Sequence, residues 1–234
     1  MEQKNENSFK TIILNILLPV LILNKGTKYG LSATQALCLA LAFPLGYGIY
    51  SLIKEKKINY VSVLGLVNIL FSGVLTLLGL GGIWFAVKEA LFPLLIGIFV
   101  WFSSFRSKPF FETMFINPSL FDIEKLKASL DTETKKTDFK NLLIKSTQYF
   151  SYSFLFSAAL NFGLSLYIFK PLAETLPLEE KQTILNQQLS QMTMMSMVVI
   201  LIPSMIFVGI IMYNAFNKTK VITGLSMDDL MIKK

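Results

Sequence analysis

Histidine is absent from the 234 residues of this chain, and cysteine occurs once, as Cys38. Without histidine the chain cannot build a His-based catalytic triad, an imidazole base or the usual zinc site. A single cysteine cannot form a disulfide within the chain. P-loop, Rossmann and Gly-x-Ser-x-Gly patterns are missing as well. We therefore expect a protein that is not an enzyme and that uses no cofactor.

Charged residues are also scarce, at 16% of the chain, whereas 53% of the residues are hydrophobic. Soluble domains average about 25% charged residues, so the shortfall indicates a membrane protein. The expected fold class is all-α, a polytopic membrane protein whose immediate partner is the lipid bilayer. The net charge of +7 agrees with the enrichment of lysine and arginine on the cytoplasmic side of membrane proteins, and we expect no nucleic-acid partner.

Six apolar runs predict about six transmembrane helices. Apart from the first, each run is long enough to cross a hydrocarbon core of ~30 Å as a helix. Between Lys10 and Lys25 the first run provides only about 21 Å at ~1.5 Å per residue, so a re-entrant hairpin is an alternative there. Together the runs predict a single helical membrane domain over residues 1–234. The runs cover residues 11–24, 31–53, 58–80, 83–105, 147–169 and 191–216.

The basic residues between these runs predict the orientation of the chain, because lysine and arginine accumulate on the cytoplasmic side. With six spans, one side receives the N-terminal tail, the 54–57 turn, the 106–146 loop and the C-terminal tail, which hold most of the basic residues. Both termini are therefore predicted to be cytoplasmic. The opposite side holds Lys25, Lys28, Lys170 and Lys181.

Two connections have internal patterns. In the predicted cytoplasmic loop 106–146, residues 109–117 begin with proline and place four apolar side chains on one face, which predicts a short interfacial helix on the inner leaflet. The polar stretch 122–138 follows and is expected to be a solvated linker. On the opposite side, residues 176–191 carry Pro177 at a plausible first turn and predict a surface-lying or protruding helix that leads into the last run. The apolar side chains at 109–117 are Phe110, Phe111, Met114 and Phe115.

The strongest candidate site is the adjacent pair Lys88 and Glu89, inside the apolar run 83–105. Consecutive residues lie ~100° apart around a helix, so we do not expect a ready-made ion pair. At a depth of about 8 Å, Lys88 can bend its stem toward the interface, whereas the shorter Glu89 needs a cation or water. Two interpretations stay open: a protonatable contact inside the bundle, or a carboxylate satisfied by Lys88, another lysine or interfacial water.

Three asparagines, Asn15, Asn68 and Asn161, complete the candidate intramembrane polar site. An amide can hydrogen-bond across membrane helices for ~0.6 kcal/mol on average, so structural contacts are expected and substrate binding is the alternative. Proline also interrupts four runs and predicts kinks. These residues are Pro19, Pro44, Pro93 and Pro203.

The sequence MTMMSM at residues 192–197 contains four thioethers. Thioethers are soft ligands that suit Cu(I), but methionine is also an ordinary filler of apolar cores. Because no histidine or nearby cysteine accompanies the cluster, we expect no metal site.

Three stretches, LLPVLILN at 17–24, YGLSATQAL at 29–37 and LLGLGGIWFAVKEALFPLLIGIFVWFSSFRSKPF at 77–110, resemble the intracellular septation protein A family of bacterial inner-membrane-spanning proteins and related uncharacterised membrane proteins. In the septation family the corresponding helix carries Lys-Pro-Thr and ends in a basic residue followed by proline. Lys88 matches the lysine and Lys108-Pro109 the ending. Glu89-Ala90 replace Pro-Thr, a departure that favours the uncharacterised relatives, which carry Lys-Glu in this helix.

The resemblance covers residues 12–116 and implies a protein of the bacterial inner membrane that is linked to envelope maintenance and cell division. The expected function is a non-catalytic interaction or scaffold role with other inner-membrane proteins, and homo-oligomer formation is left open. The alternative is a small secondary transporter for a solute or lipid, coupled to protons through Glu89. A transporter needs a water-accessible polar cavity, so a cavity around Glu89 would distinguish the two functions.

Overall fold

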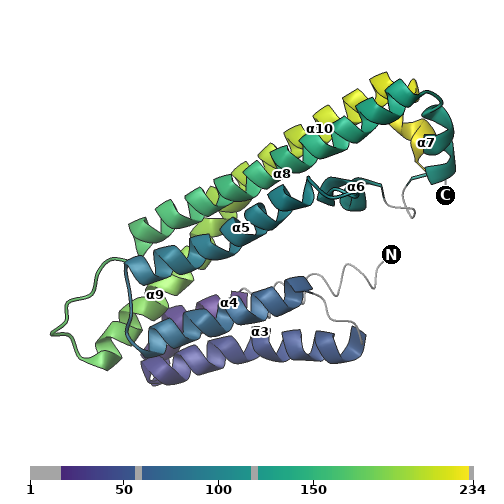
Figure 1. Ribbon diagram of the computed structural model, residues 1–234. Coiled ribbons are helices and arrows are strands. Elements are labelled where there is room, and N and C mark those ends of the chain that lie inside the picture. The colour runs from purple at the N-terminus through teal and green to yellow at the C-terminus, as the bar shows by residue number, and fades with distance from the viewer. Residues whose placement is uncertain (1–16, 56–59, 117–120, 232–234) are drawn as a thin grey trace. The chain divides into compact units, whose positions relative to one another are not determined.

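The computed structural model describes residues 17–55, 60–116 and 121–231, and every regular element in these ranges is a helix (Figure 1). The predicted all-α class is therefore confirmed. Within these ranges, three helices are long and apolar enough to cross a membrane, which supports the assignment to membrane proteins. They comprise Ile83–Ser103, Glu133–Ile168 and the continuous helical stretch Leu178–Thr223.

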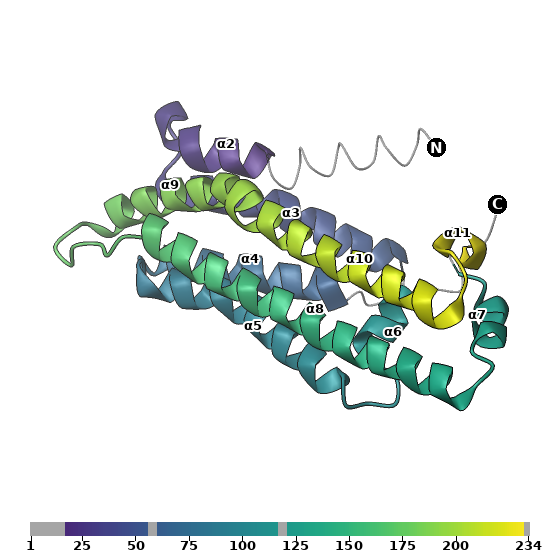
Figure 2. The ribbon, with the colours of Figure 1, turned by 90° about the horizontal axis from the view of Figure 1, so that it is seen from above.

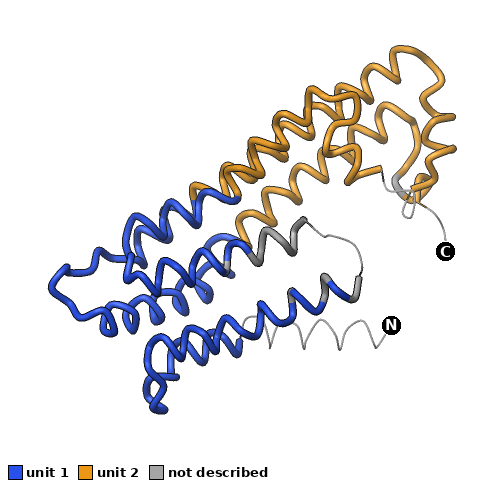
Figure 3. Tube along the Cα trace, turned by 60° about the horizontal axis from the view of Figure 1, so that its bottom comes forward, with its two compact units in different colours: residues 1–92, 160–200 blue, residues 93–159, 201–234 orange. Residues whose placement is uncertain are grey.

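The chain forms two compact units, each assembled from segments that are distant in sequence (Figure 3). Unit 1 comprises residues 1–92 and 160–200, and unit 2 comprises residues 93–159 and 201–234. Helix α5 (Ile83–Ser103) contributes its first turns to unit 1, and α8 (Glu133–Ile168) contributes its last turns. Wholly inside unit 1 lie α2 (Leu18–Lys25), the 3₁₀ helix η2 (Gly26–Tyr29), α3 (Ala33–Glu55), α4 (Tyr60–Leu77) and α9 (Leu178–Ser196).

In unit 1, α3 packs against α2, α4 and α9, and α2 also packs against α9 (Figures 1 and 2). Phe85 of α5 and Phe169, just after α8, stack in the core with ring centroids 4.1 Å apart. The predicted runs 31–53 and 58–80 correspond to α3 and α4. Of the first run, residues 11–16 lie outside the described residues, and α2 accounts for most of its remainder.

The predicted outer helix does begin after Pro177, as α9, and its first turn is exposed, but one of its faces is buried in unit 1. Leu185 is completely buried in the core of unit 1, and Gln182 and Asn186 are buried with it. The polar side chains are tolerated there because they bind backbone groups at the ends of α3 and α4. Gln182 Nε2 donates to the carbonyl of Leu77 at 3.0 Å, and Asn186 Nδ2 donates to the carbonyl of Ala33 at 2.9 Å.

The turn between α4 and α5 depends on glycine for two reasons. Gly79 and Gly82 adopt positive φ values of 67° and 58°. Residues with a Cβ atom rarely adopt such values. Gly81 lies so close to α9 that a Cβ atom would stand 3.2 Å from Leu185 and 3.3 Å from Leu172. The turn therefore lets the chain reverse while its backbone packs directly on apolar side chains.

Unit 2 contains the second part of α5, most of α8 and four further helices around an aromatic core. Phe150 of α8 packs edge-on against Phe154, and the ring of Phe115 contacts both Phe121 and Phe216. Ser151 of α8 donates to the carbonyl of Gly97 in α5 at 3.0 Å. The four helices are α6 (Phe110–Phe115), α7 (Ile123–Ser129), α10 (Ile202–Thr223) and α11 (Met227–Leu230).

The helix predicted at 109–117 is present as α6, preceded by Pro109. Its apolar face is divided: Phe111 and Phe115 are buried in the core of unit 2, whereas Met114 is exposed. The backbone N–H of Phe111 donates to Thr147 Oγ1 of α8 at 3.1 Å. Phe110 is partly buried and stacks on Phe150 of α8. Three of the four predicted membrane-facing side chains therefore pack against protein.

The stretch 122–138, predicted as a solvated linker, is largely exposed, but most of it is helical. Asp122 caps α7 by accepting a hydrogen bond from the N–H of Lys125 at 2.9 Å. Ion pairs then stabilise the start of α8, Lys135 with Asp131 at 2.9 Å and Lys136 with Glu133 at 2.7 Å. Helix caps and charge pairs three or four residues apart stabilise exposed helices, even where the sequence has no apolar periodicity.

Between α9 and α10 the helix continues through a π-helical segment, η3 (Met197–Leu201). The widened turn directly precedes Pro203, at the start of α10. Proline lacks an N–H group and its ring clashes with the carbonyl four residues earlier, so a local change of helical pitch accommodates it. The other predicted interruptions, Pro44 and Pro93, lie inside α3 and α5.

Candidate functional site

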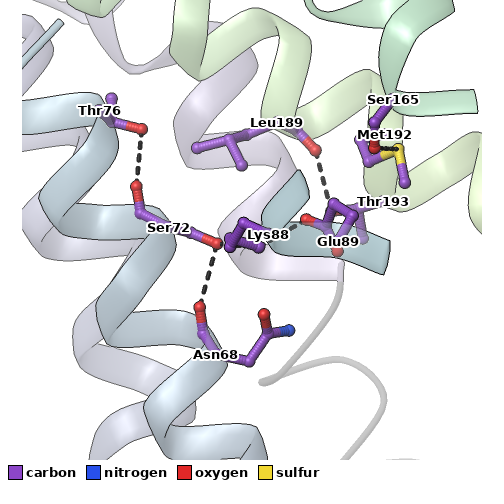
Figure 4. A network of polar contacts seen from close by, with 9 residues as sticks. All are labelled: Asn68, Ser72, Thr76, Lys88, Glu89, Ser165, Leu189, Met192 and Thr193. Atoms are coloured by element: carbon purple, nitrogen blue, oxygen red, sulfur yellow. Dashed lines mark hydrogen bonds and ion pairs between the residues drawn. The ribbon is translucent and has the colours of Figure 1, made fainter. Parts of the chain in front are cut away.

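Lys88 and Glu89 form an ion pair with an Nζ–Oε1 distance of 2.6 Å (Figure 4). The expectation that they would not form a ready-made pair is therefore wrong, and the contact agrees with the interpretation in which Lys88 satisfies the carboxylate. The ~100° between consecutive positions separates the Cα–Cβ directions, but the long lysine stem bends back far enough to reach the next carboxylate. Lys88 Nζ also donates to Ser72 Oγ of α4 at 2.5 Å, so the ammonium links two helices.

Burial of the pair is asymmetric. Lys88 is only 1% exposed, whereas the Glu89 side chain is 16% exposed. The predicted bending of Lys88 toward the interface is wrong, because the ammonium finds its partners inside unit 1. Its Nζ also lies 5.9 Å from the centroid of Phe85, within the range of a cation–π contact.

The hydroxyl of Ser72 is oriented by α4 itself. Ser72 Oγ donates to the carbonyl of Asn68 at 3.1 Å, which leaves its lone pairs for the Lys88 ammonium. One turn later, Thr76 Oγ1 donates to the carbonyl of Ser72 at 3.0 Å. A short ladder of side chains on α4 therefore presents an acceptor to the buried cation (Figure 4).

A cavity of about 250 Å³ opens beside the pair. It brings together four of the five predicted site residues, Lys88, Glu89, Asn68 and Asn161, from three helices. Asn15 lies outside the described residues. The complete lining is Pro19, Val20, Leu23, Ala40, Leu41, Pro44, Asn68, Ser72, Lys88, Glu89, Asn161, Leu189, Met192, Thr193 and Ser196.

Three polar side chains of this cavity, Asn68, Thr193 and Ser196, retain acceptor capacity for a ligand. Asn68 Oδ1 is buried and accepts no hydrogen bond from the described part of the chain. Thr193 Oγ1 donates to the carbonyl of Leu189 at 2.9 Å, and Ser196 Oγ donates to the carbonyl of Thr193 at 2.9 Å. Both hydroxyls keep acceptor lone pairs. A buried amide oxygen without a partner is costly, so a donor group on a bound molecule would satisfy it.

Sequence reasoning missed the hydroxyl residues of the cavity, Ser72, Thr193 and Ser196. One signal was available for the first, because Ser72 follows Asn68 by four residues and therefore lies on the same face of a helix. No comparable signal marked Thr193 and Ser196, which lie on a helix whose packing partner is remote in sequence.

The methionine side chains of residues 192–197 do not converge on a common site. Met192 is buried and its Sδ accepts a hydrogen bond from Ser165 Oγ at 3.7 Å, whereas Met194 and Met197 are exposed. Within residues 17–55, 60–116 and 121–231, no group of three or more Asp, Glu, Cys or His side chains is placed to hold a metal ion.

Comparison of the chain with protein-family models, curated proteins and solved structures gives no match. The formal charges of the site sum to zero, its hydroxyls and the Asn68 amide oxygen offer acceptors, and eight of its fifteen lining residues are apolar. Such an arrangement suits a small polar or zwitterionic molecule better than an ion of one sign.

Proposed function

We propose that this chain is a multi-pass membrane protein that binds a small polar or zwitterionic solute in the cavity of unit 1 and acts as a secondary transporter without catalysis or a cofactor. One observation carries the proposal: a buried Lys88–Glu89 pair borders a cavity of about 250 Å³ with an unsatisfied amide oxygen, Asn68 Oδ1. Ionisable groups within membrane helices are costly and typically mark a substrate or ion pathway.

The membrane arrangement that belongs to this proposal has six spans, with both termini in the cytoplasm of a bacterium and the spans in its inner membrane. Three long apolar helices and the lysine-rich connections support it. In this arrangement, residues 1–234 form a single membrane-embedded domain. The 106–146 loop lies on the cytoplasmic side in this arrangement.

Prolines in the cavity wall fit a transport function. Pro19 and Pro44 line the cavity, and Pro44 lies inside α3. Proline within a membrane helix frees a backbone carbonyl that can face a cavity or a ligand. Broken or kinked helices at the binding site are a common feature of secondary transporters.

Accessibility of the cavity to water tests the proposal. In a Cys38→Ser background, the only native thiol is removed, and Ser196→Cys places a new one in the cavity wall. We expect a membrane-impermeant methanethiosulfonate reagent to label it in purified, folded protein. The matched control is Ser165→Cys, which is completely buried in α8 and does not line the cavity, and which we expect to stay unlabelled. Failure to label Ser196→Cys would contradict a solute-accessible site.

Transport itself is measured in reconstituted vesicles with a panel of radiolabelled neutral and zwitterionic amino acids, sugars and amines. We expect uptake of at least one solute class that Glu89→Gln abolishes, at equal amounts of folded protein. Glu174→Gln, an exposed acidic residue of unit 1, is the control and should leave uptake unchanged.

A second candidate is the envelope- or division-associated scaffold role, which the resemblance at residues 17–24, 29–37 and 77–110 favours. This role requires contacts with other inner-membrane proteins, or between copies of this chain, rather than an accessible cavity. Co-purification of division or wall-synthesis proteins after crosslinking in cells, together with an unlabelled Ser196→Cys, would favour the scaffold over the transporter.

A further inference from the structure

A groove of about 370 Å³ lies between α8 and α10 in unit 2, remote in sequence from the Lys88–Glu89 site. Its walls come from these two helices alone, both of which belong to segments apolar enough to cross a membrane. The groove has no role in the proposed function. Its lining residues are Leu142, Lys145, Ser146, Tyr149, Phe207, Ile210, Ile211, Asn214, Ala215 and Lys218.

Two lysines lie at one end of this groove. Helices α8 and α10 run side by side in opposite directions (Figures 1 and 2), so Lys145, in the first half of α8, and Lys218, near the end of α10, lie toward the same end of the groove. Both side chains are exposed, and neither forms an ion pair within the described ranges. The groove therefore carries two uncompensated positive charges.

The opposite part of the groove is apolar. Phe207 stacks on Phe156 of α8 with ring centroids 5.7 Å apart, and Ile211 is buried beside it. Ile210 is exposed and leaves an apolar surface open along α10. At ~1.5 Å per residue, the distance along α10 from Lys218 to Phe207 is about 16 Å, which is comparable to one leaflet of the hydrocarbon core.

Each lysine also lies next to one end of an apolar run. Lys145 precedes the run 147–169 by two positions, and Lys218 follows the run 191–216 by two positions. Two independent helices thus place an ammonium group at the same membrane depth. A molecule that fits this groove has an anionic group at the membrane–water interface and an apolar portion that extends toward the membrane centre.

We propose that this groove binds one acidic phospholipid, with the phosphate between Lys145 and Lys218 and an acyl chain along Phe207, Ile210 and Ile211. The ammonium groups supply charge-assisted hydrogen bonds to phosphate oxygens, and basic pockets between membrane helices on the cytoplasmic side attract acidic headgroups. Tyr149 and Asn214 add neutral polar groups to the lining.

Native mass spectrometry of the full-length protein, titrated with phosphatidylglycerol or phosphatidylcholine, tests this site. We expect wild-type protein to retain phosphatidylglycerol in preference to phosphatidylcholine. Lys145→Gln and Lys218→Gln should each weaken phosphatidylglycerol binding roughly fivefold, the equivalent of about 1 kcal/mol per lysine. Lys220→Gln is the matched control: it removes the same charge two residues further along α10, outside the groove, and should preserve binding.

Three results would overturn the proposal. One is equal retention of the two lipids by the wild-type protein. Another is an equal loss of phosphatidylglycerol in Lys218→Gln and Lys220→Gln, which would mean that net charge rather than the groove governs binding. The third is displacement of phosphatidylglycerol by the same concentration of soluble glycerol phosphate, which would assign the lysines to a free phosphate compound.

Discussion

Lys88 holds the carboxylate of its chain neighbour Glu89 at an Nζ–Oε1 distance of 2.6 Å. The two charges do not have the same surroundings, because Lys88 is almost completely enclosed while Glu89 borders the cavity of unit 1. Ser72 supplies the second partner of the ammonium from α4. The buried cation therefore depends on its carboxylate more than the carboxylate depends on the cation.

This asymmetry predicts unequal effects of single substitutions on stability. Glu89→Gln leaves the enclosed Lys88 ammonium with only neutral partners, and the free energy of unfolding should fall by roughly 3 kcal/mol, as for other broken buried pairs. Lys88→Met should cost less, because the Glu89 carboxylate borders a cavity where it can be hydrated. Thermal unfolding in detergent measures both variants.

The double variant Lys88→Met/Glu89→Gln is the control for the pair. Replacing both partners removes the uncompensated charge, so its free energy of unfolding should recover toward that of the wild type. Additive losses in the double variant would show that the two side chains do not interact.

The buried glutamine of α9 predicts a second stability effect. Gln182 accepts from Thr34 Oγ1 at 2.8 Å and donates to the carbonyl of Leu77 at the end of α4. Gln182→Leu leaves both groups without this partner, and the expected loss is about 1–3 kcal/mol. Gln187→Leu, at an exposed position of the same helix, should change stability by no more than about 0.5 kcal/mol. Equal losses would mean that the helix responds to hydrophobic substitution in general.

Acidification should weaken the start of α8. The pKa of Asp131 lies below its ordinary range, because the Lys135 ammonium donates a hydrogen bond to it and attracts its negative charge. Since the pKa is lower in the folded state, the pair contributes stability at neutral pH and loses it as the pH falls through the folded-state pKa. The contribution of this exposed pair is small.

Carboxyl NMR of full-length protein measures this titration. Asp131 should titrate below the ordinary range in the wild type and return toward it in Lys135→Gln. The neighbouring Lys136 pairs with Glu133 instead, so Lys136→Gln should leave the Asp131 midpoint nearly unchanged. A midpoint that is insensitive to Lys135→Gln would rule out the pair in solution.

Thiol labelling in intact cells tests the proposed orientation. In a Cys38→Ser background, Thr137→Cys lies in the predicted cytoplasmic segment and Ala173→Cys lies in the connection after α8, and both positions are exposed. An impermeant reagent should label Ala173→Cys in intact cells and Thr137→Cys only after permeabilisation, because the lysine-rich side is retained in the cytoplasm. The reverse pattern would invert the orientation.

The length of the apolar runs in the sequence was sufficient to predict the helices that expose an apolar surface. The run 83–105 anticipated α5 closely, and runs 31–53 and 58–80 anticipated α3 and α4. The same reasoning did not predict the buried face of α9, because its polar residues suggested contact with water. Gln182 and Asn186 are instead satisfied by the backbone at the ends of distant helices, and no local pattern in the sequence specifies such partners.

The sequence predicted which residues belong to the candidate site, but it did not predict their contacts with one another. Charge is rare in apolar runs, which identifies Lys88 and Glu89 as candidates, but their angular separation of ~100° around the helix does not predict their contact. Lysine side chains are long enough to override a ~100° separation. The convergence of Asn68 and Asn161 on the pair could not be predicted, because it depends on which helices pack together in unit 1.

Helix α9 closes a wall that the earlier helices cannot complete. Leu189, Met192, Thr193 and Ser196 border the cavity, although they follow Glu89 by about a hundred positions in the chain. During synthesis the ribosome releases α2 to α5 first, so the Lys88 ammonium enters the membrane before its enclosure exists. Such long-range closure slows folding and leaves intermediates exposed. A chain interrupted before residue 178 would thus present an open, charged flank to the lipid or to the membrane's quality-control proteases.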